Sequence, residues 1–264
     1  MQRNVTVTLD LESDGPAQLA LAVAIAGGQR AEEHFTATQS GAEIPVTVLD
    51  DIHGGRLHVL DVRSGPVRVE YLATVTGQAA EADIDAMQQI RYLRPSRYCE
   101  SDMLRPVAVA EFSGLRGAEL LSAVASWVGT RVAYVTGSSL PTDGAVSTML
   151  SRRGVCRDFA HLVVAFLRAL DVPARVVAVY APGLAPMDFH AVAEAAIDGV
   201  WHVVDATTLA PRQSMVRIAT GRDAADIAFL SARGDLPVRI TDLQVLAVVD
   251  DLPRDDTLQL AVLR

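Results

Sequence analysis

The first part of the chain alternates apolar and polar residues with a period of two, which predicts strands that each bury one face. The alternation is clear at residues 5–11, 19–25, 44–48, 57–59 and 67–71. Glycine-containing turns separate these stretches. Short strands joined by glycine turns are typical of a sandwich, so residues 1–77 are predicted to form an N-terminal β-sandwich domain.

The pattern changes after the predicted sandwich. Residues 78–116 are largely polar and irregular, and they are predicted to form a linker with a first helix. Apolar residues recur at helical spacing over 117–132 and in two helices within 142–170, the second of which begins at Cys156. Strands are predicted at residues 175–180, 190–197 and 200–205. The fold class is therefore α+β, with a second domain at 78–264 in which a helix packs on an antiparallel sheet.

Charge narrows the possible partners. All 23 basic residues are arginine, against 32 acidic residues, and the net charge is −9. An acidic chain without clustered arginines lacks the basic surface that phosphate groups need, so neither nucleic acid nor an anionic membrane is expected as a partner. The first residues carry acidic side chains where a signal peptide would be basic and then apolar. We therefore expect a soluble, cytoplasmic protein.

The chain has two cysteines, Cys99 and Cys156. That number excludes a disulfide framework and a four-cysteine metal site. Cys156 stands in the first turn of a largely apolar helix, where the backbone amides stabilise a thiolate and so favour a nucleophile. The alternative is an ordinary buried cysteine, which is common for this residue type. Cys99 is interpreted as a structural thiol.

A hairpin downstream supplies partners for this thiol. Asp198-Gly199 is a two-residue turn that pairs Ile197 with Val200 and so fixes the register of the flanking strands. In that register His190 and Asp205 are diagonal neighbours on one face, about 7–8 Å apart at the backbone. A carboxylate that holds the imidazole in one tautomer makes it a base for the thiol. The alternative is a pair that only stabilises the hairpin.

Other candidate residues carry weaker signals. His161 lies about 140° round the helix from Cys156 and is expected to face away from the thiol. The backbone amide of Cys156 is expected to contribute to an oxyanion hole. A second donor is not fixed by the sequence, and Trp127 and Tyr134 are the candidates.

Three separated motifs occur in an order that resembles the transglutaminase-like superfamily, in a bacterial branch with a β-rich N-terminal domain. They are GVCRDFAH at 154–161, HA at 190–191 and WHVVDAT at 201–207. The resemblance implies a papain-like core in which Cys156 is the nucleophile, His190 the base and Asp205 the orienting acid. One departure is Val192, where the motif usually has an aromatic residue, and this affects the shape of the substrate slot.

These observations predict an enzyme that attacks a carboxamide or peptide carbonyl with a thiolate and forms a thioester. If water accepts the acyl group, the enzyme is a peptidase or amidase; if an amine accepts it, the enzyme is a transglutaminase. The sequence does not distinguish between these two acceptors. The expected partner is a protein or peptide substrate, with no cofactor and no metal. A metal site at Cys156, His190 and Asp205 is the poorer interpretation, because the carboxylate is better placed to orient the histidine. The rival from another class is a non-catalytic peptide- or protein-binding module.

Overall fold

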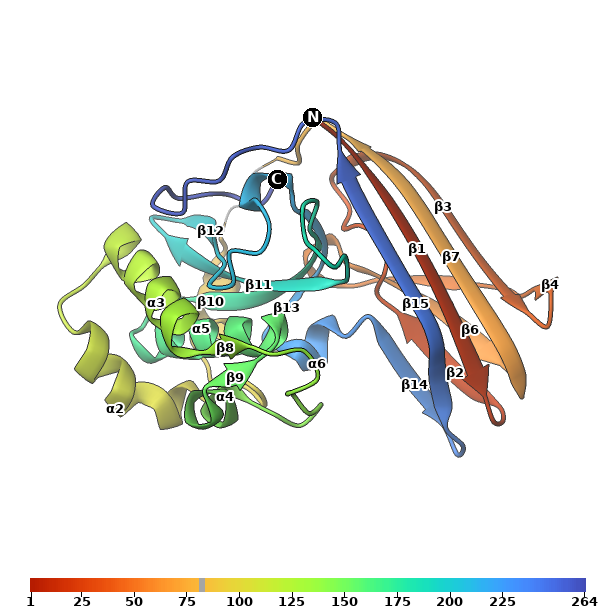
Figure 1. The fold of residues 1–264 in the computed structure, drawn as a ribbon, viewed down its shortest axis with the longest axis horizontal. Helices are drawn as coiled ribbons and strands as arrows, with labels where there is room; N and C mark the ends of the chain where they lie inside the picture. Colours follow the sequence, from red (N-terminus) through yellow and green to blue (C-terminus); the bar gives the residue numbers. More distant parts are fainter. Residues whose placement is uncertain (81–83) are drawn as a thin grey trace.

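The computed structural model describes residues 1–80 and 84–264. The chain forms an N-terminal β-sandwich beside a core of helices and a central sheet (Figure 1). In the described part of the chain, no helix is long and apolar enough to cross a membrane.

The alternating residues of the N-terminal segment pack between two antiparallel sheets. One sheet has the order β15-β1-β7-β3-β4 and the other β14-β2-β6-β5. On β1, Val5, Val7, Leu9 and Leu11 are buried while their neighbours are not, as the period of two predicts. The N-terminal segment contributes β1 (Gln2–Ser13), β2 (Ala17–Leu21), β3 (Arg30–Gln39), β4 (Ala42–Glu43), β5 (Thr47–Asp50), a 3₁₀ turn at Ile52–Gly54, β6 (Arg56–Val62) and β7 (Gly65–Thr76).

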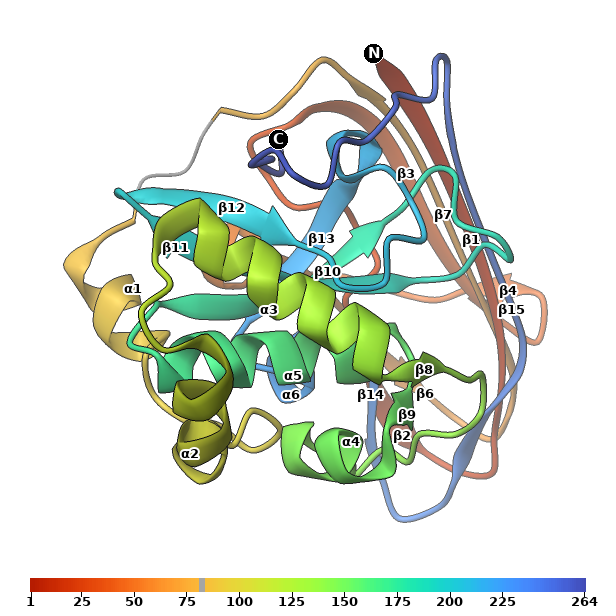
Figure 2. The ribbon, with the colours of Figure 1, turned by 60° about the vertical axis from the view of Figure 1, so that its left-hand side comes forward.

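The core is built on an antiparallel sheet of order β12-β11-β10-β13. Two helices, α3 and α5, lie on one face of this sheet (Figure 2). The strands of the core are β8 (Ala133–Tyr134), β9 (Arg153–Gly154), β10 (Ala174–Tyr180), β11 (His190–Ile197), β12 (Val200–Val204) and β13 (Val216–Gly221). The helices are α1 (Ala86–Arg91), α2 (Ser101–Phe112), α3 (Gly117–Arg131), α4 (Ala145–Ser151), α5 (Cys156–Ala169) and α6 (Ala224–Ile227), with a 3₁₀ turn at Arg212–Ser214.

The C-terminal part of the chain returns to the sandwich, which differs from the expected division at residue 77. Strand β14 (Leu230–Gly234) pairs with β2, and β15 (Val238–Val249) pairs with β1 along nearly its whole length. The sequence placed both strands in the second domain, because a pairing between residues more than 200 positions apart leaves no local signal. The sandwich is therefore assembled from both ends of the described chain.

The polar segment before α3 is more regular than expected. Residues 101–112 form the helix α2, although Pro106 lies inside it. Pro106 is the sixth residue of the helix, beyond the first turn, so the helix forms without the hydrogen bond that an N–H at this position would donate to the carbonyl of Asp102. Leu104, Ala108 and Phe112 are buried, so a single apolar stripe fixes this helix against the core.

The two faces of the core sheet have different neighbours. Ala191, Ala193 and Val204 belong to the large apolar cluster that includes the buried side chains of α5. Val192 and Val203 instead belong to a smaller cluster on the opposite face. Strand β11 is thus buried on both sides, which explains why its sequence is almost continuously apolar.

Beyond this smaller cluster, the same face of the sheet carries a buried ion cluster. The Glu194 carboxylate accepts from Arg175 Nε at 2.7 Å and from Arg217 Nη2 at 2.7 Å. The Arg175 guanidinium lies 3.9 Å from the centre of the Trp201 ring. Burial would raise the pKa of Glu194, but the two arginines outweigh it and lower the pKa from 4.5 to about 2. The cluster joins β10, β11, β12 and β13 and so holds the sheet that carries the site.

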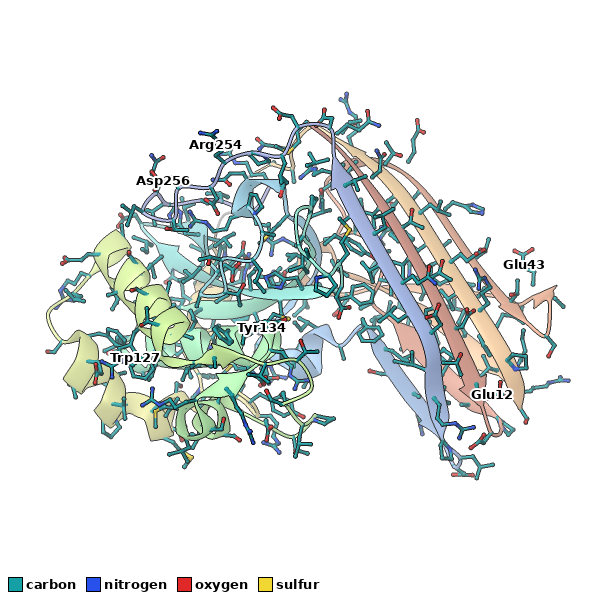
Figure 3. All side chains as sticks on the ribbon, viewed as in Figure 1. Glu12, Glu43, Trp127, Tyr134, Arg254 and Asp256 are labelled. Atoms are coloured by element: carbon teal, nitrogen blue, oxygen red, sulfur yellow. The ribbon has the colours of Figure 1, made fainter. Side chains whose placement is uncertain are left out.

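Replacing Glu194→Gln should destabilise the protein by about 3–5 kcal/mol, because it leaves two buried arginines without their partner. Urea denaturation at pH 7 measures this loss. Since the pKa of Glu194 is lowered, its stabilising effect is present above pH 4.5 and is lost as the pH falls toward 2. The difference between wild type and variant should shrink over that range. Glu43→Gln, at an exposed position of the sandwich (Figure 3), is the matched control with little expected effect.

Candidate active site

Cys156 is the first residue of α5, as the sequence predicts. The helix start is fixed by Asp158, whose carboxylate accepts the Val155 backbone N–H at 2.8 Å and the Ser139 hydroxyl at 2.9 Å. Cys156 is partly exposed, whereas the rest of the helix from Asp158 onward is buried. The thiol therefore stands at the one accessible end of an otherwise buried helix, where the amide dipoles favour an anion.

Gly154 stands where the chain passes close to the side chain of Asp158. A Cβ at this position would lie 2.6 Å from the Cβ of Asp158, closer than any side chain could tolerate. Glycine is needed because the capping carboxylate passes directly over the backbone at this point. Glycine is thus required at the start of α5 because the Asp158 side chain lies so close to it, and not because the backbone has an unusual conformation here.

The predicted hairpin register is confirmed. Ile197 pairs with Val200, and Asp198 and Gly199 have φ angles of 52° and 82°, as a type I′ turn requires. His190 is the first residue of β11, and Asp205 follows the last residue of β12. The Nε2 atom of His190 lies 3.5 Å from Oδ2 of Asp205, and both side chains are almost fully buried.

The pair does not meet Cys156 across the sheet. The residues that share its face, such as Val192 and Val203, point away from α5. His190 and Asp205 reach the thiol because they stand at the ends of their strands, beside the end of the sheet where α5 begins. The structure therefore brings together the three residues that the sequence singled out, through an arrangement that strand alternation alone does not predict.

His190 interacts with both neighbours. Burial alone would lower its pKa, but the neighbouring Asp205 carboxylate and Cys156 side chain outweigh burial and raise the pKa to about 10. Because Nε2 faces Asp205, Nδ1 is the ring nitrogen left for the sulfur. This Nδ1 is buried and has no hydrogen-bond partner among the residues that the structure describes. At neutral pH the imidazole is thus held as a cation between a carboxylate and the thiol.

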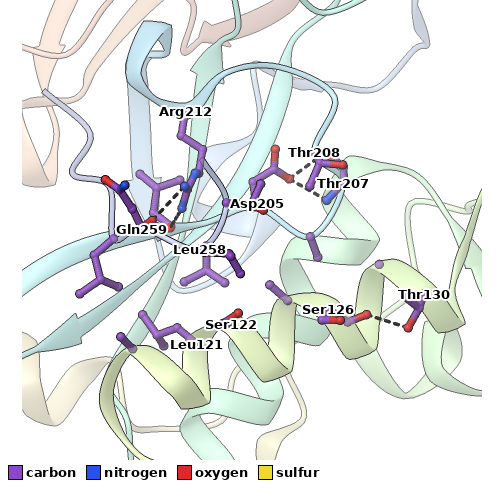
Figure 4. A pocket seen from close by; sticks show the side chains of 18 residues that line it. Leu121, Ser122, Ser126, Thr130, Asp205, Thr207, Thr208, Arg212, Leu258 and Gln259 are labelled. Carbon is purple, nitrogen blue, oxygen red and sulfur yellow. Dashed lines mark hydrogen bonds between the residues drawn. The ribbon is translucent and has the colours of Figure 1, made fainter. Parts of the chain in front are cut away.

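Thr207 orients the acid, a role that the sequence did not reveal. Its backbone N–H and its hydroxyl both donate to Oδ1 of Asp205, at 2.8 and 2.7 Å (Figure 4). The hydroxyl oxygen also lies 3.5 Å from Nε2 of His190. With Oδ1 occupied, Oδ2 is the carboxylate oxygen directed at the imidazole. The only sequence signal was the position of Thr207, two residues after the candidate acid in the third motif.

Tyr134 lies beside the thiol. Strand β8 pairs in parallel with β9, which sets Tyr134 opposite Gly154, two residues before Cys156. The Tyr134 hydroxyl lies beside the backbone amide and the side chain of Cys156 and interacts with both. Burial, together with the charge of Cys156, raises the pKa of Tyr134 to about 12, so the hydroxyl keeps its proton at neutral pH.

The other candidate residues lie away from the thiol. The indole N–H of Trp127 donates to Glu111 at 2.8 Å, and its ring packs on Phe166, so it supports the helices. His161 is fully buried and accepts the Ala224 backbone N–H at 3.1 Å, consistent with the packing role expected for it. Burial raises the pKa of Cys99 to about 12, which makes this thiol unreactive.

Comparisons with known proteins agree with this geometry. A family model described as the transglutaminase-like superfamily matches residues 112–206. The crystal structure of a candidate cysteine protease from Cytophaga hutchinsonii is 32% identical, covers 96% of this chain and 92% of its own, and has a TM-score of 0.88.

Curated relatives match over shorter stretches. An uncharacterised protein of Mycobacterium leprae is 28% identical over 145 residues, and one of Mycobacterium tuberculosis is 37% identical over 81 residues. The matched segments are 49% and 30% of this chain. They span 49% and 26% of those proteins, so this chain matches half of their length or less.

The match to the Cytophaga structure extends over nearly the whole of both chains, and the family model spans the segment from the end of α2 to the residue after Asp205. The architecture is the α+β arrangement predicted, a β-sandwich joined to a papain-like core. The chain belongs to the transglutaminase-like superfamily.

Proposed function

We propose that the protein is a cysteine-nucleophile acyl-transfer enzyme that acts on carboxamide or peptide bonds through a thioester intermediate. The observation that carries this proposal is the position of His190 between Asp205 and the thiol of Cys156, with a raised pKa. A histidine that stays protonated beside a thiol at a helix start favours the thiolate–imidazolium pair over the neutral pair.

The reaction follows from this ion pair. The Cys156 thiolate attacks the carbonyl carbon, and the electron pair of the C=O bond moves onto oxygen. When the C–N bond breaks, His190 transfers its proton to the leaving amine, and the acyl group remains on sulfur as a thioester. Water or an amine then loses a proton to His190 as it attacks the thioester, which restores the pair. Asp205 and Thr207 hold the imidazole in place throughout.

The developing oxyanion needs two donors. The Cys156 backbone N–H is one, and the Tyr134 hydroxyl is the second donor that we propose, because it already contacts that N–H. In the resting site the hydroxyl also bonds to the side chain of Cys156. A substrate carbonyl entering there accepts from the Cys156 N–H in place of the Tyr134 oxygen, and from the Tyr134 O–H in place of the Cys156 side chain. The Tyr134 hydroxyl thus interacts with the thiol in the resting site and with the oxyanion once a substrate is bound.

Cys156→Ala should abolish amide turnover, because no other thiol is available in the site. Products are measured by mass spectrometry after incubation with a peptide pool, with and without an added primary amine. Hydrolysed and amine-linked products distinguish the two acceptors. Thermal unfolding should stay close to wild type, since Cys156 is partly exposed. Turnover at the wild-type rate in this variant would contradict the proposal, and binding of peptides without turnover in the wild type would favour the non-catalytic module.

Asp205→Asn should lower the pKa of His190 from about 10 toward 6.5, because it removes the hydrogen bond and charge that raise it. The imidazolium is then lost at lower pH, and the Cys156 thiolate that it stabilises should be alkylated more slowly near neutral pH. Iodoacetamide alkylation between pH 5 and 10 measures this, with Cys99 as the unreactive internal control. Asp198→Asn, at the turn of the same hairpin, is the matched control. Identical profiles for wild type and Asp205→Asn would contradict the ion pair.

Tyr134→Phe should reduce amide turnover by about 10²–10³, the usual effect of losing one oxyanion donor. The thiol of this variant should still react with iodoacetamide, because alkylation develops no oxyanion. A loss of turnover with alkylation retained therefore separates this role from general damage to the site. Tyr98→Phe, at the ring that stacks on His161, serves as the control. Equal losses in both measurements would contradict the role of the Tyr134 hydroxyl.

A further inference from the structure

Asp188 lies at the candidate site, but the reaction described above gives it no role. It belongs to the segment that leads into β11 and stands two residues before His190. Two residues of chain span at most about 7 Å, so the backbones of Asp188 and His190 are close together. The Asp188 side chain is exposed, so a ligand can reach it from solvent.

The residue between Asp188 and His190 shows which way Asp188 faces. The ring of Phe189 stacks on Phe229 at 4.8 Å between centres and lies 5.7 Å from the ring of Tyr180. Phe189 is thus turned toward the sandwich and its returning strand. Successive side chains of a chain that enters a strand point to opposite faces. Asp188 and His190 therefore share the face that Phe189 leaves.

The electrostatic neighbours of Asp188 agree with this direction. Its carboxylate interacts with the charge of His190, and its own charge contributes to the raised pKa of Tyr134. His190 and Tyr134 belong to different elements, and both interact with Cys156. Asp188 therefore lies beside the thiol, near both the base and the proposed oxyanion donor.

One oxygen of this carboxylate is unused. Oδ1 of Asp188 accepts the Phe189 backbone N–H at 2.7 Å. Within the described part of the chain, no group donates a hydrogen bond to Oδ2, and no arginine forms an ion pair with Asp188. The arginine next to the nucleophile, Arg157, donates instead to the Ser139 hydroxyl and to the Leu140 carbonyl. Oδ2 is therefore available to a donor that the substrate brings.

The charge of Asp188 is only partly compensated in the resting site. Burial raises its pKa, and the Phe189 N–H and the charge of His190 offset part of that effect. A cation bound at Oδ2 would stabilise the charged carboxylate. The protonation of His190 is governed by Asp205 and Cys156, so Asp188 is not required to hold the imidazolium.

We propose that Asp188 is a specificity-determining residue that binds a cationic side chain of the substrate, lysine or arginine, close to the amide that Cys156 attacks. The inference rests on the proposed function and adds the substrate class, a basic peptide or protein. The net charge of −9 favours the approach of such a substrate.

Two alkylating probes that differ only in charge test this assignment. N-(3-aminopropyl)chloroacetamide ends in an ammonium group, and N-butylchloroacetamide ends in a methyl group of similar size. In the wild type the cationic probe should label Cys156 about fivefold faster than the neutral probe, relative to the same ratio for free cysteine. This ratio corresponds to about 1 kcal/mol.

Two variants locate the source of the preference. In Asp188→Asn the ratio should fall to about one, because asparagine keeps the acceptor for the Phe189 N–H and loses only the charge. Asp198→Asn removes the same charge at the exposed turn of the hairpin and should keep the wild-type ratio. A wild-type ratio near one, or a raised ratio that persists in Asp188→Asn, overturns the assignment. An equal loss in Asp198→Asn also overturns it, since the preference would then follow net charge alone.

Peptide turnover tests the substrate class itself. Replacing a lysine next to the attacked amide by methionine should slow the wild type about fivefold and should not slow Asp188→Asn. Equal slowing of both proteins overturns the substrate class. The neutral probe alone tests the proposed function: if it labels Cys156 no faster than free cysteine at pH 7, that function fails, whatever the ratio between the two probes.

Discussion

The starting point of strand β11 is the constraint on which the site depends. His190 is the first residue of that strand, and its side chain meets Cys156 only because the strand begins beside the start of α5. The Asp198-Gly199 turn sets the register from one end of the hairpin, and a shift by one residue would turn every side chain of the strand to the other face. The ion cluster at Glu194 resists such a shift, since it ties β11 to both arginines.

The sequence predicts the elements that obey a local rule. The type I′ turn, the helix that begins at Cys156 and the alternation on β1 all depend on residues close to one another in the chain, and the structure contains each of them. Strand β3 has the sequence RAEEHFTATQ, in which adjacent acidic residues hide any alternation, because Ala37 is the only fully buried residue of this strand. Strands β14 and β15 carry apolar residues, yet their partners β2 and β1 lie at the other end of the chain.

The same distinction applies to the candidate site. His190 and Asp205 were predictable because one short hairpin relates them. Tyr134 was one of two candidates for the second donor, and the sequence could not choose between them because its position depends on a parallel pairing with Gly154. Thr207 was not singled out, since its role depends on a double hydrogen bond to Oδ1 of Asp205 that no spacing encodes. The thiol alone could have been an ordinary buried cysteine, and its partial exposure at the end of a buried helix is what separates it from Cys99.

The sandwich takes part in this constraint, although it carries none of the candidate catalytic residues. The segment between β10 and β11 leads directly into His190, and it rests on the sandwich and its returning strand. Met187 accepts the Ala247 backbone N–H through its sulfur at 3.4 Å, and Phe189 stacks on Phe229, the residue before β14. At the other end of the segment, the Tyr180 hydroxyl donates to the carbonyl of Val23. Because both ends of this segment are held by the sandwich, the return of the chain to β14 and β15 also fixes where β11 begins.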